Sequence, residues 1–207
     1  MTRFTRIILA LVAILALAAL PAAANKPASP GKSESAPHGK AKGHGIGHGV
    51  TKIKSGATTL DLDAGTVAAL TGAGFGVTPA VPATAIGTTF SFPITKGRVH
   101  FANGKKKKLS GYVNHSGGIT FTKGATSVTA SDPRILLSSG KKVRLFATIG
   151  SERVRLLDLK DVAVADGKIT ANALLAKAAA DKLNAAFAVT LFTPGLAMGK
   201  VTVTPGA

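Results

Sequence analysis

The chain has 207 residues, a length that suits one medium-sized domain better than a two-domain enzyme. It contains no cysteine, which excludes disulfides, thiolate metal sites and thiol catalysis. Its 26 basic and nine acidic residues give a net charge of +17, so the chain attracts polyanions. The absence of tryptophan and the single tyrosine argue against an aromatic platform for single-stranded nucleic acid.

The first 24 residues have the pattern of a secretory signal peptide. Arg3 and Arg6 precede an uncharged apolar run over residues 7–20, and Pro21 is followed by the small residues 22–24. The run is shorter than the roughly 20 apolar residues of a membrane span, so cleavage is favoured over an uncleaved anchor. We therefore expect a product that is secreted or associated with the cell wall, with no transmembrane segment after signal cleavage.

Residues 25–54 are predicted to be a disordered basic linker. They are rich in Gly, Pro, Ser and Lys and have too few apolar side chains to form a core. His38, His44 and His48 lie in this segment, but the flanking lysines repel cations and the one nearby carboxylate is Glu34. A spacer that pairs with anionic wall polymer is therefore favoured over a metal site.

Residues 55–207 are expected to form one β-rich domain. Residues 58–62 alternate as a strand does, and Asp63 is placed to cap a short helix that ends at residues 72–74. Asp61 and Asp63 resemble a catalytic carboxylate pair. A solvent-facing strand residue and a helix cap explain them better.

Strands are predicted beyond Pro82, where apolar residues alternate with polar ones. Phe90 and Phe92 share one face, as do Val99 and Phe101, and Asn103-Gly104 is the strongest hairpin signal in the chain. Further turns are predicted at Ser116-Gly117-Gly118, Lys123-Gly124, Ser139-Gly140, Gly150-Ser151 and Asp166-Gly167. This spacing predicts a β-sandwich or a strongly bent antiparallel sheet.

A longer helix is predicted from Ala171 to about Phe187, with Thr170 as its N-cap, and residues 199–204 are predicted to return as a closing strand. One apolar stripe recurs every four residues, at Leu175, Ala179, Leu183 and Phe187. Packing of this stripe on the core is favoured over a membrane surface. The predicted fold class is therefore mainly β with two helices, a short one near the domain start and a longer one near the C-terminus.

No catalytic motif is found in the sequence. A nucleophile elbow, a zinc-protease helix and a Walker loop are all missing. The glycine-rich residues 72–76 follow a predicted helix and so do not place phosphate at a helix N-terminus. We therefore expect a protein that is not an enzyme.

Residues 110–118 are the best candidate for a binding site, because they contain Tyr112 and His115 beside a flexible turn. In a regular strand these two side chains point to opposite faces, so they converge on one atom only if a bulge intervenes. The alternative is that His115 forms a local hydrogen bond that holds the turn.

A cluster of four lysines, Lys105, Lys106, Lys107 and Lys108, follows the Asn-Gly turn. They are predicted either to bind polyanions or to form a solvated hairpin tip. Positive charge continues along the strand faces at Arg98, Arg144, Arg153 and Arg155. Export disfavours nucleic acid as the partner and favours cell-envelope polyanions.

Several short motifs follow one another in the sequence. They are Phe92-Pro93 followed by Gly97, then the stretch Leu109–Gly118, then Ser131–Ile135 and Leu145–Ala147. Their order resembles that of the HtaA domain of secreted actinobacterial haem-uptake proteins. The match covers about residues 86 to 150. The resemblance implies an exported β-rich module that binds haem and passes it along a relay of envelope proteins.

In that family a tyrosine in the N-terminal part of the domain ligates the iron, and the motif histidine hydrogen-bonds to it. His115 matches the motif histidine, whereas no tyrosine precedes Tyr112 in this chain. The resemblance thus gives His115, and then Tyr112, as cofactor-binding candidates for haem. The predicted function is a non-enzymatic cell-surface module. The alternative is a structural or adhesive envelope protein held on anionic wall polymers by its linker and lysine hairpin.

Overall fold

The computed structural model describes residues 49–102, 108–138 and 142–206. Within these ranges the chain forms twelve strands and two helices, and all strand pairings are antiparallel. The elements are β1 (Gly49–Ile53), β2 (Gly56–Leu62), α1 (Ala64–Gly72), β3 (Gly76–Ala80), β4 (Thr84–Ile86), β5 (Thr89–Ala102), β6 (Lys108–His115), β7 (Gly118–Lys123), β8 (Thr126–Leu137), β9 (Val143–Ile149), β10 (Glu152–Ala165), β11 (Lys168–Leu175), α2 (Lys177–Phe187) and β12 (Ala197–Pro205).

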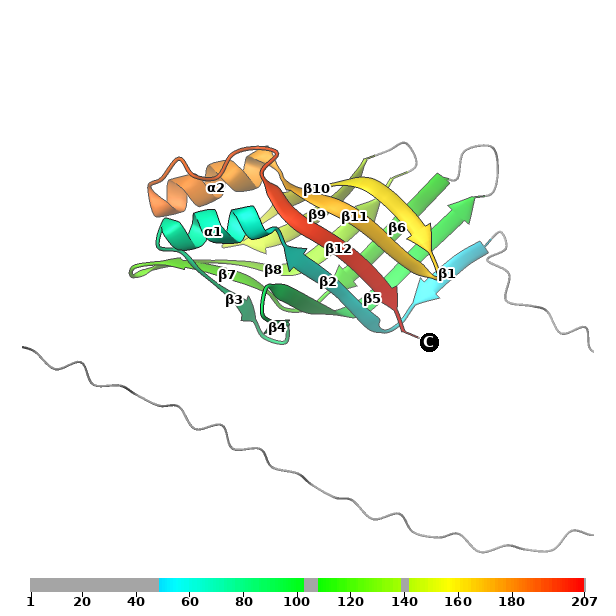
Figure 1. Cartoon of the computed structure of the whole chain (residues 1–207). Coiled ribbons are helices and arrows are strands. Elements are labelled where there is room, and N and C mark those ends of the chain that lie inside the picture. The colour runs from blue at the N-terminus through cyan, green and yellow to red at the C-terminus, as the bar shows by residue number, and fades with distance from the viewer. Residues whose placement is uncertain (1–48, 103–107, 139–141, 207) are drawn as a thin grey trace, which may run out of the picture. The chain divides into compact units, whose positions relative to one another are not determined.

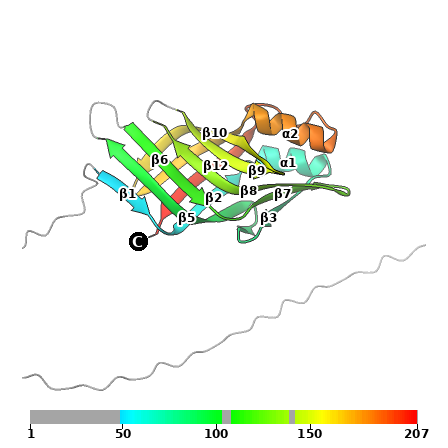
Figure 2. The same ribbon diagram turned by 180° about the vertical axis from the view of Figure 1, so that it is seen from behind.

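Eight of these strands form a ring. They pair in the order β2, β5, β6, β8, β9, β10, β11 and β12, and β12 pairs with β2 again (Figures 1 and 2). The first half of β5 pairs with β2 and its second half with β6, so this long strand completes the closure. The predicted mainly β fold with a strongly bent antiparallel sheet and two helices is confirmed, and the bend is large enough for the sheet to close on itself.

The interior of the ring is apolar because alternate residues of each strand point into it. Val99, Val113 and Ile135, from three neighbouring strands, are each at most 2% exposed. The residues next to them along the chain, such as Arg98 and Arg134, are exposed. This alternation produces a dry inner face and a wet outer face.

The predicted hairpins are confirmed at Lys123-Gly124, Gly150-Ser151 and Asp166-Gly167. β5 and β6 form the hairpin expected around Asn103-Gly104, although that turn and Ser139-Gly140 lie outside the described residues.

The predicted turn at residues 116–118 bends the chain without reversing it. β6 and β7 both pair with β8 and run in the same direction along it. Gly117 has φ of +80°, and a Cβ there would collide with the backbone of Ala80 and Ala83. Glycine is therefore required at this bend.

The predicted cap of the short helix is confirmed. The Asp63 carboxylate accepts a hydrogen bond from the backbone N–H of Thr66, at 2.9 Å, at the start of α1. Asp61 faces solvent and accepts hydrogen bonds from the hydroxyls of Thr88 and Thr89. The two carboxylates therefore serve a strand and a helix cap.

The predicted start of the longer helix is wrong. Residues 168–175 form strand β11, and the helix begins only at Lys177, so Thr170 is a strand residue and not an N-cap. β11 pairs with β10 on one side and with β12 on the other. Every second residue of it is buried, beginning with Ile169, because alternate side chains point into the ring. Leu175 belongs to this strand, while Ala179, Leu183 and Phe187 form the buried face of the helix.

The predicted end of the linker is also wrong. Residues 49–53, expected to be disordered, form β1 along the second half of β5. Ile53 is only 3% exposed because it packs in the core. The folded domain therefore begins before residue 55, and residues 1–48, including the predicted signal peptide and the three linker histidines, lie outside the described residues.

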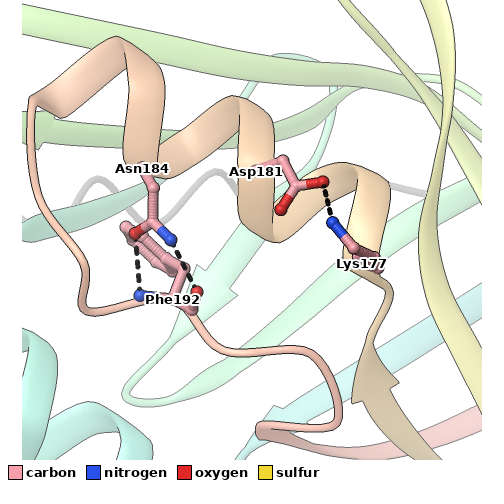
Figure 3. Close-up of polar contacts among 4 residues, drawn as sticks. All are labelled: Lys177, Asp181, Asn184 and Phe192. Atoms are coloured by element: carbon pink, nitrogen blue, oxygen red, sulfur yellow. Dashed lines mark hydrogen bonds and ion pairs between the residues drawn. The ribbon is translucent and has the colours of Figure 1, made fainter.

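Both helices lie side by side at one end of the sheet (Figures 1 and 2). Beneath them, Phe75 makes edge-to-face contacts with Phe187 and Phe192, with ring centroids 4.9 and 5.3 Å apart. The Asn184 amide holds Phe192 in place by two hydrogen bonds to its backbone, at 2.7 and 3.0 Å (Figure 3). In the described part of the chain, neither helix has the length and apolar character needed to cross a membrane.

Candidate functional site

His115 lies inside the ring and connects three strands. It is the last residue of β6, and its side chain is 5% exposed. Its Nδ1 lies 2.8 Å from the carbonyl oxygen of Pro133 on β8, and its Nε2 lies 2.7 Å from the hydroxyl of Thr58 on β2. Because a carbonyl only accepts, Nδ1 carries the proton, and Nε2 accepts from the threonine hydroxyl.

This environment keeps the imidazole neutral. Burial lowers the pKa of His115 from 6.5 to about 4, and the hydrogen bond to Pro133 opposes this shift only in part. Thr58 is 2% exposed. Both ring nitrogens are therefore occupied and shielded from solvent. The side chain ties β2, β6 and β8 together, over a longer range than the local turn contact considered from the sequence.

A cavity of about 20 Å³ lies beside this pair. Its walls are apolar apart from His115 and Thr58, and they include Leu60, Phe92 and Leu145. This volume is enough for about one water molecule, whereas ligand pockets measure roughly 300 to 1,000 Å³. The cavity cannot hold a porphyrin.

Tyr112 lies on the opposite face of β6, as the strand alternation predicts. It pairs across the strands with Arg98, and the guanidinium of Arg134 lies 5.0 Å from the centre of its ring. The preceding Gly111 has φ of +133°, and a Cβ there would collide with the carbonyl of Arg98. This glycine lets β5 and β6 approach closely beside the tyrosine.

The structure therefore does not bring Tyr112 and His115 together. His115 faces the interior with Val113, and Tyr112 faces outward with Asn114. The resemblance leads one to expect a tyrosine as the hydrogen-bond partner of the motif histidine, and this chain has Thr58 there. The described residues do not fit haem: the histidine has no free nitrogen, the tyrosine lies outside the ring, and the cavity is too small.

The outer face of the sheet carries a cluster that the sequence shows only in part. Arg98, Arg134, Arg144, Arg153 and Arg155 all occupy outward-facing positions on β5, β8, β9 and β10. Sequence reasoning singled out four of them and missed Arg134, whose signal is its place between the buried residues Pro133 and Ile135. We refer to these five residues together with Tyr112 as the arginine face.

Few carboxylates compensate the arginine face. Among the residues that the structure describes, Arg155 is the one arginine in an ion pair, at 3.4 Å from Asp158. Arg153 donates to the backbone carbonyl of Asp132 at 2.7 Å. Burial and the neighbouring Arg134 lower the pKa of Arg153, and the Asp132 carboxylate opposes them. Like charges are thus held together on this face.

The other predicted sites are only partly visible. Lys105, Lys106 and Lys107 lie outside the described residues, and Lys108 begins β6. His38, His44 and His48 also lie outside them. Within residues 49–102, 108–138 and 142–206, no group of three or more His, Cys, Asp or Glu side chains is placed to hold a metal ion.

Comparison with protein-family models and with curated proteins finds no match. Comparison with solved structures finds the crystal structures of the C-terminal and N-terminal domains of HtaA from Corynebacterium glutamicum. Each matches this chain with a TM-score of 0.51 and 16% sequence identity. Each match covers 75% of this chain and 99% of the HtaA domain. The chain thus has the fold of these domains, which its motif order indicated.

Proposed function

We propose that this protein is an exported, non-enzymatic module of the cell envelope that is retained on anionic envelope polymers by its positive charge. The observation that carries the proposal is the excess of uncompensated basic side chains on a closed, well-packed sheet. Three ion pairs are found among the described residues, and they engage Arg155, Lys177 and Lys182. The chain as a whole carries a net charge of +17.

The N-terminal sequence supports an envelope location. Its basic start, apolar run and small residues before position 25 have the order of an export signal. The basic residues 25–48 would follow directly in the mature chain and add to its positive charge. Such a chain meets anionic polymers of the envelope as soon as it is exported.

The hydrogen bonds of His115, Asp61 and Asp63 support a role without catalysis. A general acid or base must reach the proton that it transfers. His115 is buried and neutral and has both nitrogens bonded. Asp61 and Asp63 are engaged by threonine hydroxyls and by a helix N-terminus.

Haem is the second candidate ligand, because the fold is that of HtaA domains. The described residues do not fit haem in the interior, so we expect titration of the purified mature protein with hemin to give no saturable Soret band. A saturable band that His115→Ala abolishes would replace our proposal with a haem-relay function.

The retention of the protein in its native cells tests the proposal directly. Envelope fractions are washed with increasing NaCl, and the released protein is measured by immunoblotting. Screening shortens the reach of exposed charges from about 8 Å at physiological ionic strength to about 3 Å at 1 M salt. We expect steep release over this range, and weaker retention when the four lysines 105–108 are replaced by glutamine. Protein that stays in the cytoplasm, or that remains bound at high salt, would contradict the proposal.

A further inference from the structure

Arginine is concentrated on one face of the domain. All five arginines that follow the predicted signal peptide lie on the arginine face. Two exposed lysines lie beside them, because Lys52 on β1 pairs with Arg98 and Lys96 on β5 pairs with Asn114. Other lysines lie on other elements, among them Lys123 on β7, Lys168 on β11, Lys182 on α2 and Lys200 on β12. Lysine thus occurs throughout the domain, whereas arginine occurs on this face.

Strand pairing brings the arginines close together although they are distant in sequence. Tyr112 pairs with Arg98 on β5 and with Leu136 on β8, and Leu136 pairs with Arg144 on β9. In the adjacent row, Phe146 on β9 pairs with Arg134 and with Arg155. Neighbouring strands are about 4.8 Å apart, so these residues lie on one face of the adjacent strands β5, β6, β8 and β9. Figure 2 shows these four strands side by side.

This area combines guanidinium groups, which each present several N–H donors in one plane, with half-buried apolar side chains. The Arg134 guanidinium lies over the Tyr112 ring, 5.0 Å from its centre, so a guanidinium and an aromatic ring are held together at the surface. Tyr112, Leu136 and Phe146 are each partly exposed between the charged side chains. A guanidinium matches two oxygens of a phosphate at once, whereas a lysine ammonium acts as a point charge.

We propose that the arginine face is a binding site for the phosphodiester groups of an anionic envelope polymer. Arg98, Arg134 and Arg144 bind successive phosphates, and the partly exposed Tyr112 and Phe146 contact the polyol or sugar between them. This inference rests on the proposed function, and it adds a defined site and a ligand class to retention by charge. The predicted export makes an envelope polymer a better ligand than nucleic acid.

The closeness of Arg134 and Arg153 agrees with this assignment. Burial first, and then repulsion by Arg134, lowers the pKa of Arg153. The carboxylates near this face, Asp132 and Asp158, number fewer than its arginines. A bound phosphate would reduce this repulsion, since each phosphodiester carries one negative charge.

The test separates specific recognition from charge. The purified mature protein is titrated with poly(glycerol phosphate) and with polygalacturonate, a carboxylate polymer, by calorimetry at about 150 mM salt. Arg98, Arg134 and Arg144 are replaced together by lysine, which preserves the net charge. The matched control replaces Lys160, Lys168 and Lys200, on β10, β11 and β12, by glutamine and removes three charges elsewhere on the sheet.

We expect the arginine-to-lysine variant to bind poly(glycerol phosphate) about tenfold or more weakly, because the bidentate contacts are lost. The control should weaken this binding by less than about threefold, and the wild type should prefer the phosphate polymer to the carboxylate polymer. Unchanged binding by the arginine-to-lysine variant, or an equal loss in the control, would overturn the site while leaving retention by charge intact.

Two further outcomes complete the test. If the proposed function holds, both variants remain bound to the envelope at low salt. A wild-type protein that is not bound to the envelope at low salt would refute the proposed function, whatever the result for the arginine face. The protein is also titrated with single-stranded DNA. If DNA binds more tightly than poly(glycerol phosphate), and if this binding depends on the same three arginines, the ligand is not an envelope polymer.

Discussion

The buried His115 makes the stability of the domain depend on pH. In the folded protein its pKa is about 4, against 6.5 for the exposed residue. Between these two values the unfolded chain binds a proton that the folded chain does not, so the free energy of unfolding falls as the pH decreases from above 6.5 to 4. At about 1.36 kcal/mol per pKa unit, this one group removes roughly 3 kcal/mol of stability over that interval.

The variant His115→Gln isolates this effect because glutamine retains hydrogen-bonding atoms but does not titrate. The cavity lining contains no other titratable residue, so the pH dependence of the difference between the two proteins belongs to His115. Urea unfolding at pH 7.5, 6, 5 and 4.5 gives the two free-energy curves. We expect the wild type to lose its advantage over the variant progressively below about pH 6.5.

A second variant, Thr58→Val, serves as the control. It removes the hydroxyl that donates to Nε2 at 2.7 Å but keeps the buried imidazole. We expect it to be less stable by about 1 to 3 kcal/mol, while its steep decline towards acid pH persists. A constant difference between wild type and His115→Gln at all four pH values would refute the burial of a neutral histidine in the ring.

Three further predictions concern the two helices, and each is tested by urea unfolding at neutral pH. Asn184→Ala leaves the backbone N–H and carbonyl of Phe192 without their partners and should lower the free energy of unfolding by roughly 2 to 3 kcal/mol. Its control, Asp181→Ala, breaks only an exposed ion pair with Lys177 and should change stability by less than about 0.5 kcal/mol. Equal effects of the two substitutions would contradict the role of the Asn184 amide. Leu183→Ala, at a fully buried position, should cost about 2 to 5 kcal/mol, and a loss below about 1 kcal/mol would show that α2 is not packed on the core. Asp63→Ala should cost about 1 kcal/mol through loss of the α1 cap, with Asp63→Asn close to wild type, and an equal loss in both variants would argue against capping.

The alternation of apolar and polar residues was enough to predict most strands. It also predicted that Tyr112 and His115 would point to opposite faces, because the side-chain period of a strand is two and the bulge at this point lies on β5, between Ile94 and Lys96. The cap at Asp63 was predictable because capping is a local property of three or four residues.

The errors came from segments whose structure depends on distant partners. Residues 171–175 contain two alanines and two leucines and continue into a real helix, so their local preference is helical, but pairing with β10 and β12 makes them a strand. Residues 49–53 gave no sign of order on their own, since β1 is stabilised by pairing with β5 and by burial of Ile53.

The sequence was enough to predict which residues are candidates for binding, but not which distant residues they contact. Thr58 is separated from His115 by 57 residues, and its one local signal is a polar side chain at a core position of β2. The gathering of the arginines depends on the order of β5, β6, β8 and β9 in the sheet, which a single sequence does not specify.

The most direct test of the account is to locate the ligand on the folded protein. Isotope-labelled mature protein is titrated with poly(glycerol phosphate), and the backbone amide resonances are followed by NMR. We expect the largest shifts on β5, β6, β8 and β9 around Arg98, Arg134 and Arg144. Shifts concentrated around the interior pair Thr58 and His115, or on β11 and β12, would contradict recognition by the arginine face.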